Sequence, residues 1–270
     1  MYVVESEKSF FFIDAAVASG IETIKPFVQD ALAKKKRMYL LITHDHWDHT
    51  GLAAYLRENG ALIFYDAAAK RNLDSDFKYM LAKDYEGYMR DFAVGEAKLA
   101  SVTELAPKQE TADVYVTDGS MVTDGDLCFE YLHTPGHVAG AGCWYLLNDK
   151  TLFSGDSIQG KGFYGCAQQI VDAIAYEKSL KRLSLMEFSA IYGGHEYVVG
   201  KKESEDYIKL SIDTDEKFYK LLIQNYMSMD RQKQSIQDLA HKMADDLGVP
   251  YALNLYNATN AYLIKFISGL

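Results

Sequence analysis

Residues 43–51, THDHWDHTG, place three of the chain's seven histidines and two aspartates directly after the apolar run MYLLIT. His44 and His46 lie two residues apart, so in extended backbone their imidazoles point the same way and can hold one metal ion. Asp48 and His49 then face a different direction, and one metal ion cannot easily use all four side chains. The segment therefore favours two neighbouring metal ions, which in two-metal sites lie roughly 3.5–4 Å apart.

Apolar periodicity predicts alternating strands and helices before this segment and after it. We expect strands over 9–17, 38–43 and 61–66 and helices over 21–35 and 51–60. The first helix places Ile24, Phe27, Val28 and Leu32 on one face.

The later part of the chain changes character twice. Turn signals predict that the strands of 114–156 are antiparallel, and 189–196 is expected to be a late strand that ends in a turn. After about residue 203 only helical patterns remain, with Ser235 as a predicted N-cap and Gly248 as a predicted stop. These patterns predict an α/β domain over residues 1–203 and a C-terminal helical segment over 204–270.

Three later segments offer further metal ligands, each where a strand gives way to a turn. HTPGH offers His137, FSGDS offers Asp156 and YGGHE offers His195. A single histidine at a strand end is usually not a ligand. Three clustered histidines and two further ones, each at a strand-to-loop turn beside glycine, favour a metal site. Of the two remaining histidines, His133 is expected to support the ligands or the fold, and His241 to lie on a helix surface.

The segments THDHWDHTG, HTPGHVAG, LFSGDS and GGHE resemble, in order and spacing, the motifs of the metallo-β-lactamase fold hydrolases. The resemblance covers roughly residues 1–200 and implies an αββα sandwich, two mixed β-sheets flanked by helices, with the metals at one edge. It implies that the first zinc is held by His44, His46 and His137. It likewise implies that the second is held by Asp48, His49 and His195, and that Asp156 bridges the two.

Such a site implies a dinuclear zinc-dependent hydrolase that uses a metal-bridging hydroxide on a small ester, thioester or related acyl substrate. Mn²⁺ or Fe²⁺ in place of Zn²⁺ would support the same mechanism of hydrolysis. Asp48 is the candidate catalytic residue, because it could both ligate a metal and orient the attacking water. Two alternatives stay open: a phosphodiesterase or nuclease with the same metals, and a catalytically idle metal-binding sensor.

Several positions separate branches of the superfamily. His46 stands where the flavodiiron oxidoreductases carry a glutamate, which favours zinc hydrolysis over redox iron. Gln159 stands where quorum-quenching lactonases have a tyrosine, which weakens a lactonase interpretation. Mononuclear persulfide dioxygenases lack part of the second ligand set, whereas every position is filled here. The usual D-x-G after the first hairpin is Asp14-Ala15-Ala16, and the strand that usually precedes this hairpin is not evident.

Two stretches supply candidate substrate contacts. SIQGKGFYGCAQ is similar to the glycine-rich segment of glyoxalase II enzymes that contacts glutathione, although a surface loop is an equally simple interpretation. The aromatic stretch 77–92 would form either a lid over the metals or a helix packed on the domain. The candidate substrate-binding residues are Lys161, Phe163, Tyr164, Tyr85, Tyr88 and Tyr197.

Charge and composition narrow the partners to a small-molecule substrate. A net charge of -10 and a pI near 5.2 argue against nucleic acid, whose binders usually carry a basic surface. The sequence shows no signal peptide and no long apolar run, and its three cysteines are widely spaced, so we expect a cytoplasmic protein that does not contact a membrane. The helical segment would either complete the pocket or form a homodimer contact.

Overall fold

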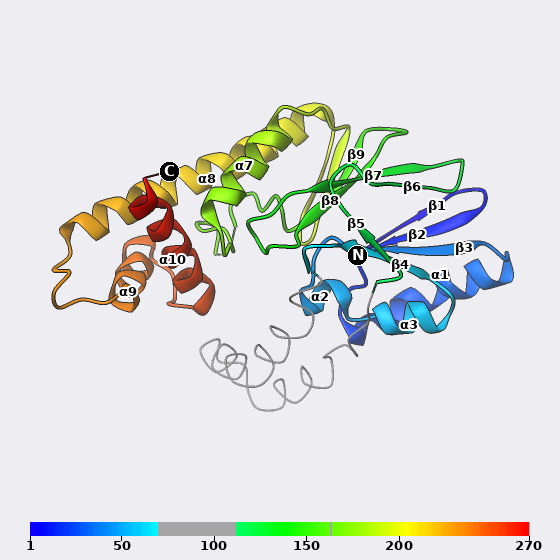
Figure 1. Ribbon diagram of the computed structural model, residues 1–270, viewed down its shortest axis with the longest axis horizontal. Coiled ribbons are helices and arrows are strands. Elements are labelled where there is room, and N and C mark those ends of the chain that lie inside the picture. The colour runs from blue at the N-terminus through cyan, green and yellow to red at the C-terminus, as the bar shows by residue number, and fades with distance from the viewer. Residues whose placement is uncertain (70–111, 163, 270) are drawn as a thin grey trace. The chain divides into compact units, whose positions relative to one another are not determined.

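The computed structural model describes residues 1–69, 112–162 and 164–269 (Figure 1). The chain separates into two compact units. The first comprises Met1–His133 and Gly140–Asp156, and the second comprises Thr134–Ala139 and Ser157–Leu270. The predicted division between residues 203 and 204 stays a prediction.

Two β-sheets organise the described chain. The first has the order β1-β2-β3-β4-β5 and the second has the order β11-β10-β9-β8-β7-β6. The strands of the first sheet are β1 (Tyr2–Glu5), β2 (Ser9–Ile13), β3 (Arg37–Leu41), β4 (Leu62–Asp66) and β5 (Val114–Val116). Those of the second are β6 (Met121–Thr123), β7 (Cys128–His133), β8 (Gly142–Leu146), β9 (Thr151–Gly155), β10 (Ala190–Gly193) and β11 (Tyr197–Val199).

Strand β2 is buried on both faces, as its sequence SFFFI predicts for a central strand. Phe10 and Phe12 belong to a core that includes residues of the helices α1 (Ile21–Ala33) and α3 (Ala53–Glu58), which lie beside the first sheet (Figure 1). Phe11 faces the other way, and its ring centroid lies 4.8 Å from that of Phe129 in the second sheet. The indole N–H of Trp144 donates to the carbonyl of Ile42, the residue that follows β3, at 3.1 Å.

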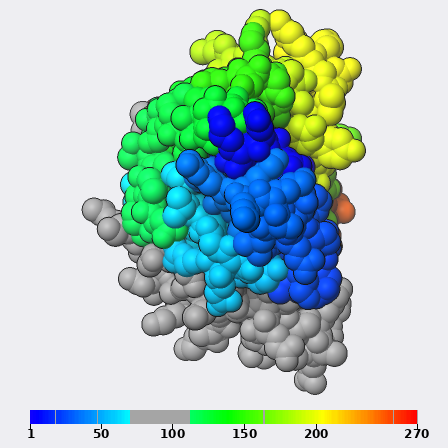
Figure 2. All heavy atoms as spheres, turned by 90° about the vertical axis from the view of Figure 1, so that its right-hand side faces the viewer, coloured from blue at the N-terminus to red at the C-terminus, as the bar shows by residue number. Residues whose placement is uncertain are grey.

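Residues of the two sheets meet on the surface as well. Figure 2 shows the dark blue N-terminal residues packed directly against the green residues that follow residue 112. The sheets with their flanking helices and the C-terminal helices match the predicted αββα architecture, and this prediction is confirmed.

The pairing of the strand at 114–116 differs from the sequence-based expectation. This strand is expected to be antiparallel, but β5 pairs in parallel with β4 in the first sheet. The antiparallel prediction holds for the pairs β6–β7, β7–β8 and β8–β9. Apolar alternation identifies a strand but does not encode its partner, so the turn signals near residue 118 cannot assign β5 to either sheet.

The buried face of α1 is narrower than its apolar residues suggest. Ile24, Val28 and Ala31 are fully buried, whereas Phe27 is 42% exposed and Leu32 is 50% exposed. Spacings of four and three residues keep the buried stripe on one line of the helix, and Phe27 and Leu32 lie on its two flanks.

Helices dominate the second unit. They are α7 (Ala173–Ser184), α8 (Lys201–Ser228), α9 (Ile236–Leu247) and α10 (Leu253–Ser268), and α8 also contacts β10 and β11. The predicted N-cap is confirmed, because the Ser235 side chain accepts from the Asp238 N–H in a capping box. Gly248 ends α9 in the left-handed conformation, as expected of a C-terminal glycine. Within the described ranges, no helix combines the length and the hydropathy that crossing a bilayer requires.

Candidate metal centre

The backbone of the THDHWDHTG segment turns sharply in its middle. His46 is extended, with φ -64° and ψ 145°, and it directly precedes the single helical turn α2 (Trp47–Thr50). This change of direction folds the histidines together. The ring centroid of His44 lies 4.6 Å from that of His46 and 4.0 Å from that of His49. The extended half of the segment therefore carries the imidazoles of His44 and His46, and the helical turn places the imidazole of His49 beside that of His44.

Asp14 holds this segment from behind, and its role was not predicted from the sequence. Its carboxylate accepts from the Thr43 N–H at 2.7 Å and from the Thr43 hydroxyl at 2.9 Å. Its Oδ2 also lies 2.7 Å from His49 Nδ1. Asp14 is only 4% exposed and has a φ of 59°, in the left-handed region that aspartate tolerates better than most residues. The sequence signal that could have revealed this role is that Asp14 occupies the aspartate position of the D-x-G motif.

The contact with Asp14 determines which nitrogen of His49 can bind a metal. A carboxylate only accepts, so His49 Nδ1 must donate and Nε2 keeps its lone pair when the ring is neutral. Burial lowers the pKa of His49, but the carboxylates of Asp14 and Asp156 outweigh that effect and raise it well above its ordinary value. The two carboxylates therefore favour the protonated ring, and a bound metal would take the place of its Nε2 proton.

His44 and His137 have their Nδ1 atoms engaged in the same way. His44 Nδ1 lies 3.1 Å from the Thr43 hydroxyl, and His137 Nδ1 lies 2.6 Å from the carbonyl oxygen of Gln169. Both histidines are 1% exposed. A carbonyl also only accepts, so His137 must donate to it and keep the Nε2 lone pair for a metal.

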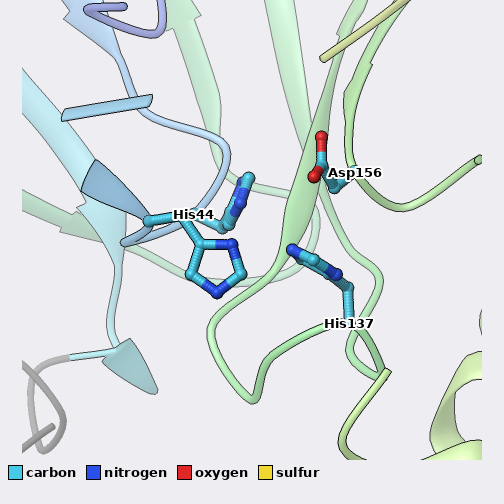
Figure 3. A group of neighbouring side chains, drawn as sticks. His44, His137 and Asp156 are labelled. Carbon is cyan, nitrogen blue, oxygen red and sulfur yellow. The ribbon is translucent and has the colours of Figure 1, made fainter. Parts of the chain in front are cut away.

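Seven side chains fall into two groups with the spacing of metal ligands. In each group the candidate ligand atoms lie within 4.8 Å of one another. Figure 3 shows three members of the first group, His44, His137 and Asp156, turned toward a common space. The first group is His44, His46, His137 and Asp156, and the second is Asp48, His49 and His195.

Asp156 also lies close to the second group. Its Oδ1 is 3.4 Å from His49 Nε2, and the same nitrogen is 3.8 Å from Asp48 Oδ2. These distances suit a carboxylate that faces two neighbouring ions. All seven residues expected from the sequence as ligands thus belong to one group or the other.

The donor chemistry fits a pair of divalent transition-metal ions. The two groups offer imidazole nitrogens and carboxylate oxygens, which suit zinc, manganese and iron. Neither group contains a thiolate.

The two remaining histidines behave as expected. His133 lies in neither group, and its Nδ1 is 2.9 Å from Oδ2 of the buried Asp66. His241 is exposed and stacks on Tyr251, with ring centroids 3.9 Å apart.

Only some of the candidate substrate residues belong to the described chain. Lys161 is exposed, Tyr164 is 41% exposed, and Tyr197 is 67% exposed with its ring stacked on Tyr192. Tyr85, Tyr88 and Phe163 lie outside the described residues, as does the predicted lid at 77–92. Partial burial raises the pKa of the Tyr164 hydroxyl above its ordinary value.

Comparison with known proteins points to one family. The family model described as the metallo-beta-lactamase superfamily matches residues 1–195. An uncharacterized protein of Aquifex aeolicus is 30% identical over 154 residues, which are 57% of this chain and 63% of that protein. A hydroxyacylglutathione hydrolase of Francisella tularensis subsp. novicida is 25% identical over 131 residues, 48% of this chain and 50% of that enzyme. The matches thus cover less than two thirds of these relatives' lengths.

Solved structures show the same fold. A metallo-beta-lactamase family protein of Thermus thermophilus superposes with a TM-score of 0.70 at 17% identity, and the match covers 99% of this chain and 88% of that one. At this identity the similarity establishes the fold alone.

Proposed function

The chain belongs to the metallo-beta-lactamase superfamily, and from this premise we propose that it is a dinuclear metal-dependent hydrolase of a small ester, thioester or related acyl compound. The observation that carries the proposal is the pair of adjoining ligand groups, each with candidate ligand atoms within 4.8 Å of one another. A single structural ion would not need seven such side chains.

The ligands divide between two ions in this proposal. His44, His46 and His137 would hold the first ion, and Asp48, His49 and His195 would hold the second. Asp156 would serve both, which its 3.4 Å distance to His49 Nε2 supports. We propose zinc as the metal, with manganese or iron as substitutes that the same nitrogen and oxygen donors would accept.

The bound ions would supply an activated water near neutral pH and positive charge opposite the developing oxyanion. The chain's own residues orient that chemistry. Asp14 and the Gln169 carbonyl hold the imidazoles of His49 and His137 with Nε2 toward the ions. Asp48 is the proposed catalytic residue, because its partly exposed carboxylate can accept a hydrogen bond from the attacking water and fix its direction.

Charge and kinship favour an acyl substrate over a nucleic acid. A polynucleotide needs several Lys or Arg contacts, whereas this chain has a net charge of -10. Several relatives are named hydroxyacylglutathione hydrolase, which denotes hydrolysis of an acyl group carried by glutathione. We propose that Lys161, Tyr164 and Tyr197 contact a compact, partly apolar substrate of this class.

We expect the metal-loaded protein to hydrolyse a small aryl ester or a hydroxyacylglutathione and to leave single-stranded RNA and DNA intact. Because no chain of phosphates is bound, the rate should change little between about 50 and 200 mM salt. The measurement compares initial rates on the four substrates with one preparation, and Asp156→Asn serves as the blank. Nuclease activity that disappears in the blank, with both acyl substrates untouched, would replace this proposal with the phosphodiesterase alternative. Metal binding without turnover of any substrate would favour the sensor alternative.

A further inference from the structure

The side chain of Gln159 forms two hydrogen bonds to the backbone of a single residue ten positions away. Its Oε1 accepts from the Gln169 N–H at 2.8 Å, and its Nε2 donates to the Gln169 carbonyl oxygen at 2.9 Å. A flipped amide would set donor against donor and acceptor against acceptor, so the two bonds fix its orientation. We call this pair of bonds the Gln159 clamp.

The carbonyl held by the clamp is the one that accepts from His137. That contact measures 2.6 Å, the shortest hydrogen bond described above for any proposed ligand. Gln159 Nε2 also lies 3.4 Å from His137 Nδ1. The two nitrogens do not bond to each other, because both donate to the carbonyl oxygen of Gln169, which has a lone pair for each. The clamp therefore fixes the position of the Gln169 carbonyl oxygen. That oxygen in turn determines the tautomer and the direction of the His137 imidazole.

The loop that contains the clamp is tied to helix α8. Ser211, which is fully buried on α8, accepts from the Gly160 N–H at 2.8 Å. The buried Gln168 side chain donates to the Gly160 carbonyl oxygen at 2.8 Å and closes the loop. Gly160 has a φ of 55°, and a Cβ there would lie 2.6 Å from the Tyr207 ring, so the approach to α8 requires glycine. All these residues belong to the second compact unit, as His137 does.

We propose that Gln159 is a positioning residue for the metal ligand His137, and that helix α8 supports it through Ser211. This gives the C-terminal helical segment a part in metal binding. The inference rests on the proposed function, because it requires His137 to ligate a metal. Partners that orient a ligating histidine typically change metal affinity by about 10–100-fold when they are removed.

Gln159→Ala should weaken zinc binding by about tenfold or more in competition with a chromophoric chelator. It should also change the visible spectrum of the cobalt-substituted protein, which reports ligand geometry without any turnover. Gln169→Ala is the matched control: it removes the neighbouring side chain but keeps the backbone carbonyl, so its zinc affinity should equal that of the wild type. Gln159→Glu keeps the shape and the acceptor but aims a carboxylate oxygen at the carbonyl, and it too should weaken binding.

Three comparisons separate the outcomes. Both metal-free Gln159 variants should remain folded at the temperature of the zinc titration, which urea unfolding checks, so that a loss of zinc affinity reports on the ligand and not on unfolding. Ser211→Ala should weaken zinc binding less than Gln159→Ala does, and wild-type affinity in this variant would refute the role of α8. If His137→Ala lowers zinc affinity while both Gln159 variants bind as the wild type does, the positioning role is wrong and the ligand assignment stands. If His137→Ala itself leaves zinc affinity unchanged, the proposed function fails at its first step.

Discussion

Asp156→Asn is expected to lower metal occupancy by about one ion per chain and to reduce hydrolysis by more than about 100-fold. In the proposed site the Asp156 carboxylate lies between the two ligand groups, where its charge offsets the repulsion between two cations. An amide of the same shape keeps the packing but carries no charge. Elemental analysis and initial rates on one acyl substrate, taken with the same preparation, measure both effects.

His241→Ala is the matched control for this substitution. His241 is exposed, stacks on Tyr251 and belongs to neither ligand group, so its loss should change neither metal content nor rate. The ligand assignment is wrong if the two variants behave alike.

Asp14→Ala is expected to lower the free energy of unfolding of the metal-free protein by about 3–5 kcal/mol, as the loss of one partner from a buried ion pair does. Asp14 is buried and accepts from the Thr43 N–H, the Thr43 hydroxyl and His49. Its removal leaves these donors buried without an acceptor, and alanine is also disfavoured at a φ of 59°. Urea unfolding in the presence of a chelator measures the loss without a contribution from bound metal.

Asp14→Asn separates the two roles of this residue. Asparagine tolerates the left-handed backbone and can still accept from Thr43, so Asp14→Asn should be more stable than Asp14→Ala although it loses the charge beside His49. Its amide N–H₂ must then face the donor Nδ1 of His49, so zinc affinity should fall by about 10–100-fold. Wild-type zinc affinity in this variant, or wild-type stability in Asp14→Ala, would show that Asp14 does not hold the histidine segment.

The ligand candidates were predictable because their signal is local. Each lies in a short motif that follows an apolar strand, and histidine and aspartate grouped in such motifs indicate metal ligands. His44, Asp156 and His195 could therefore be named without knowledge of the strand order. The groups that orient the ligands gave a much weaker signal. The Gln169 carbonyl has no side-chain identity at all, and Asp14 acts on His49 across 35 residues.

The pairing of strands and the burial of individual side chains were harder to predict than the presence of each helix and strand. The strand at 114–116 was expected, but its parallel pairing with β4 depends on tertiary contacts that its three residues do not encode. Phe27 is as apolar as Val28, yet it is 42% exposed because a helix turns its neighbours by about 100° per residue.

The metal content of the wild-type protein tests the central claim most directly. The protein would be expressed with added zinc, purified without chelators and measured by elemental analysis against its concentration from amino-acid analysis. Two ligand groups predict close to two ions per chain. His46→Ala, which removes a ligand of the first group, and His195→Ala, which removes one of the second, should each bring the value near one. A reproducible wild-type value near one with iron dominant, or no metal at all, would contradict the dinuclear hydrolase.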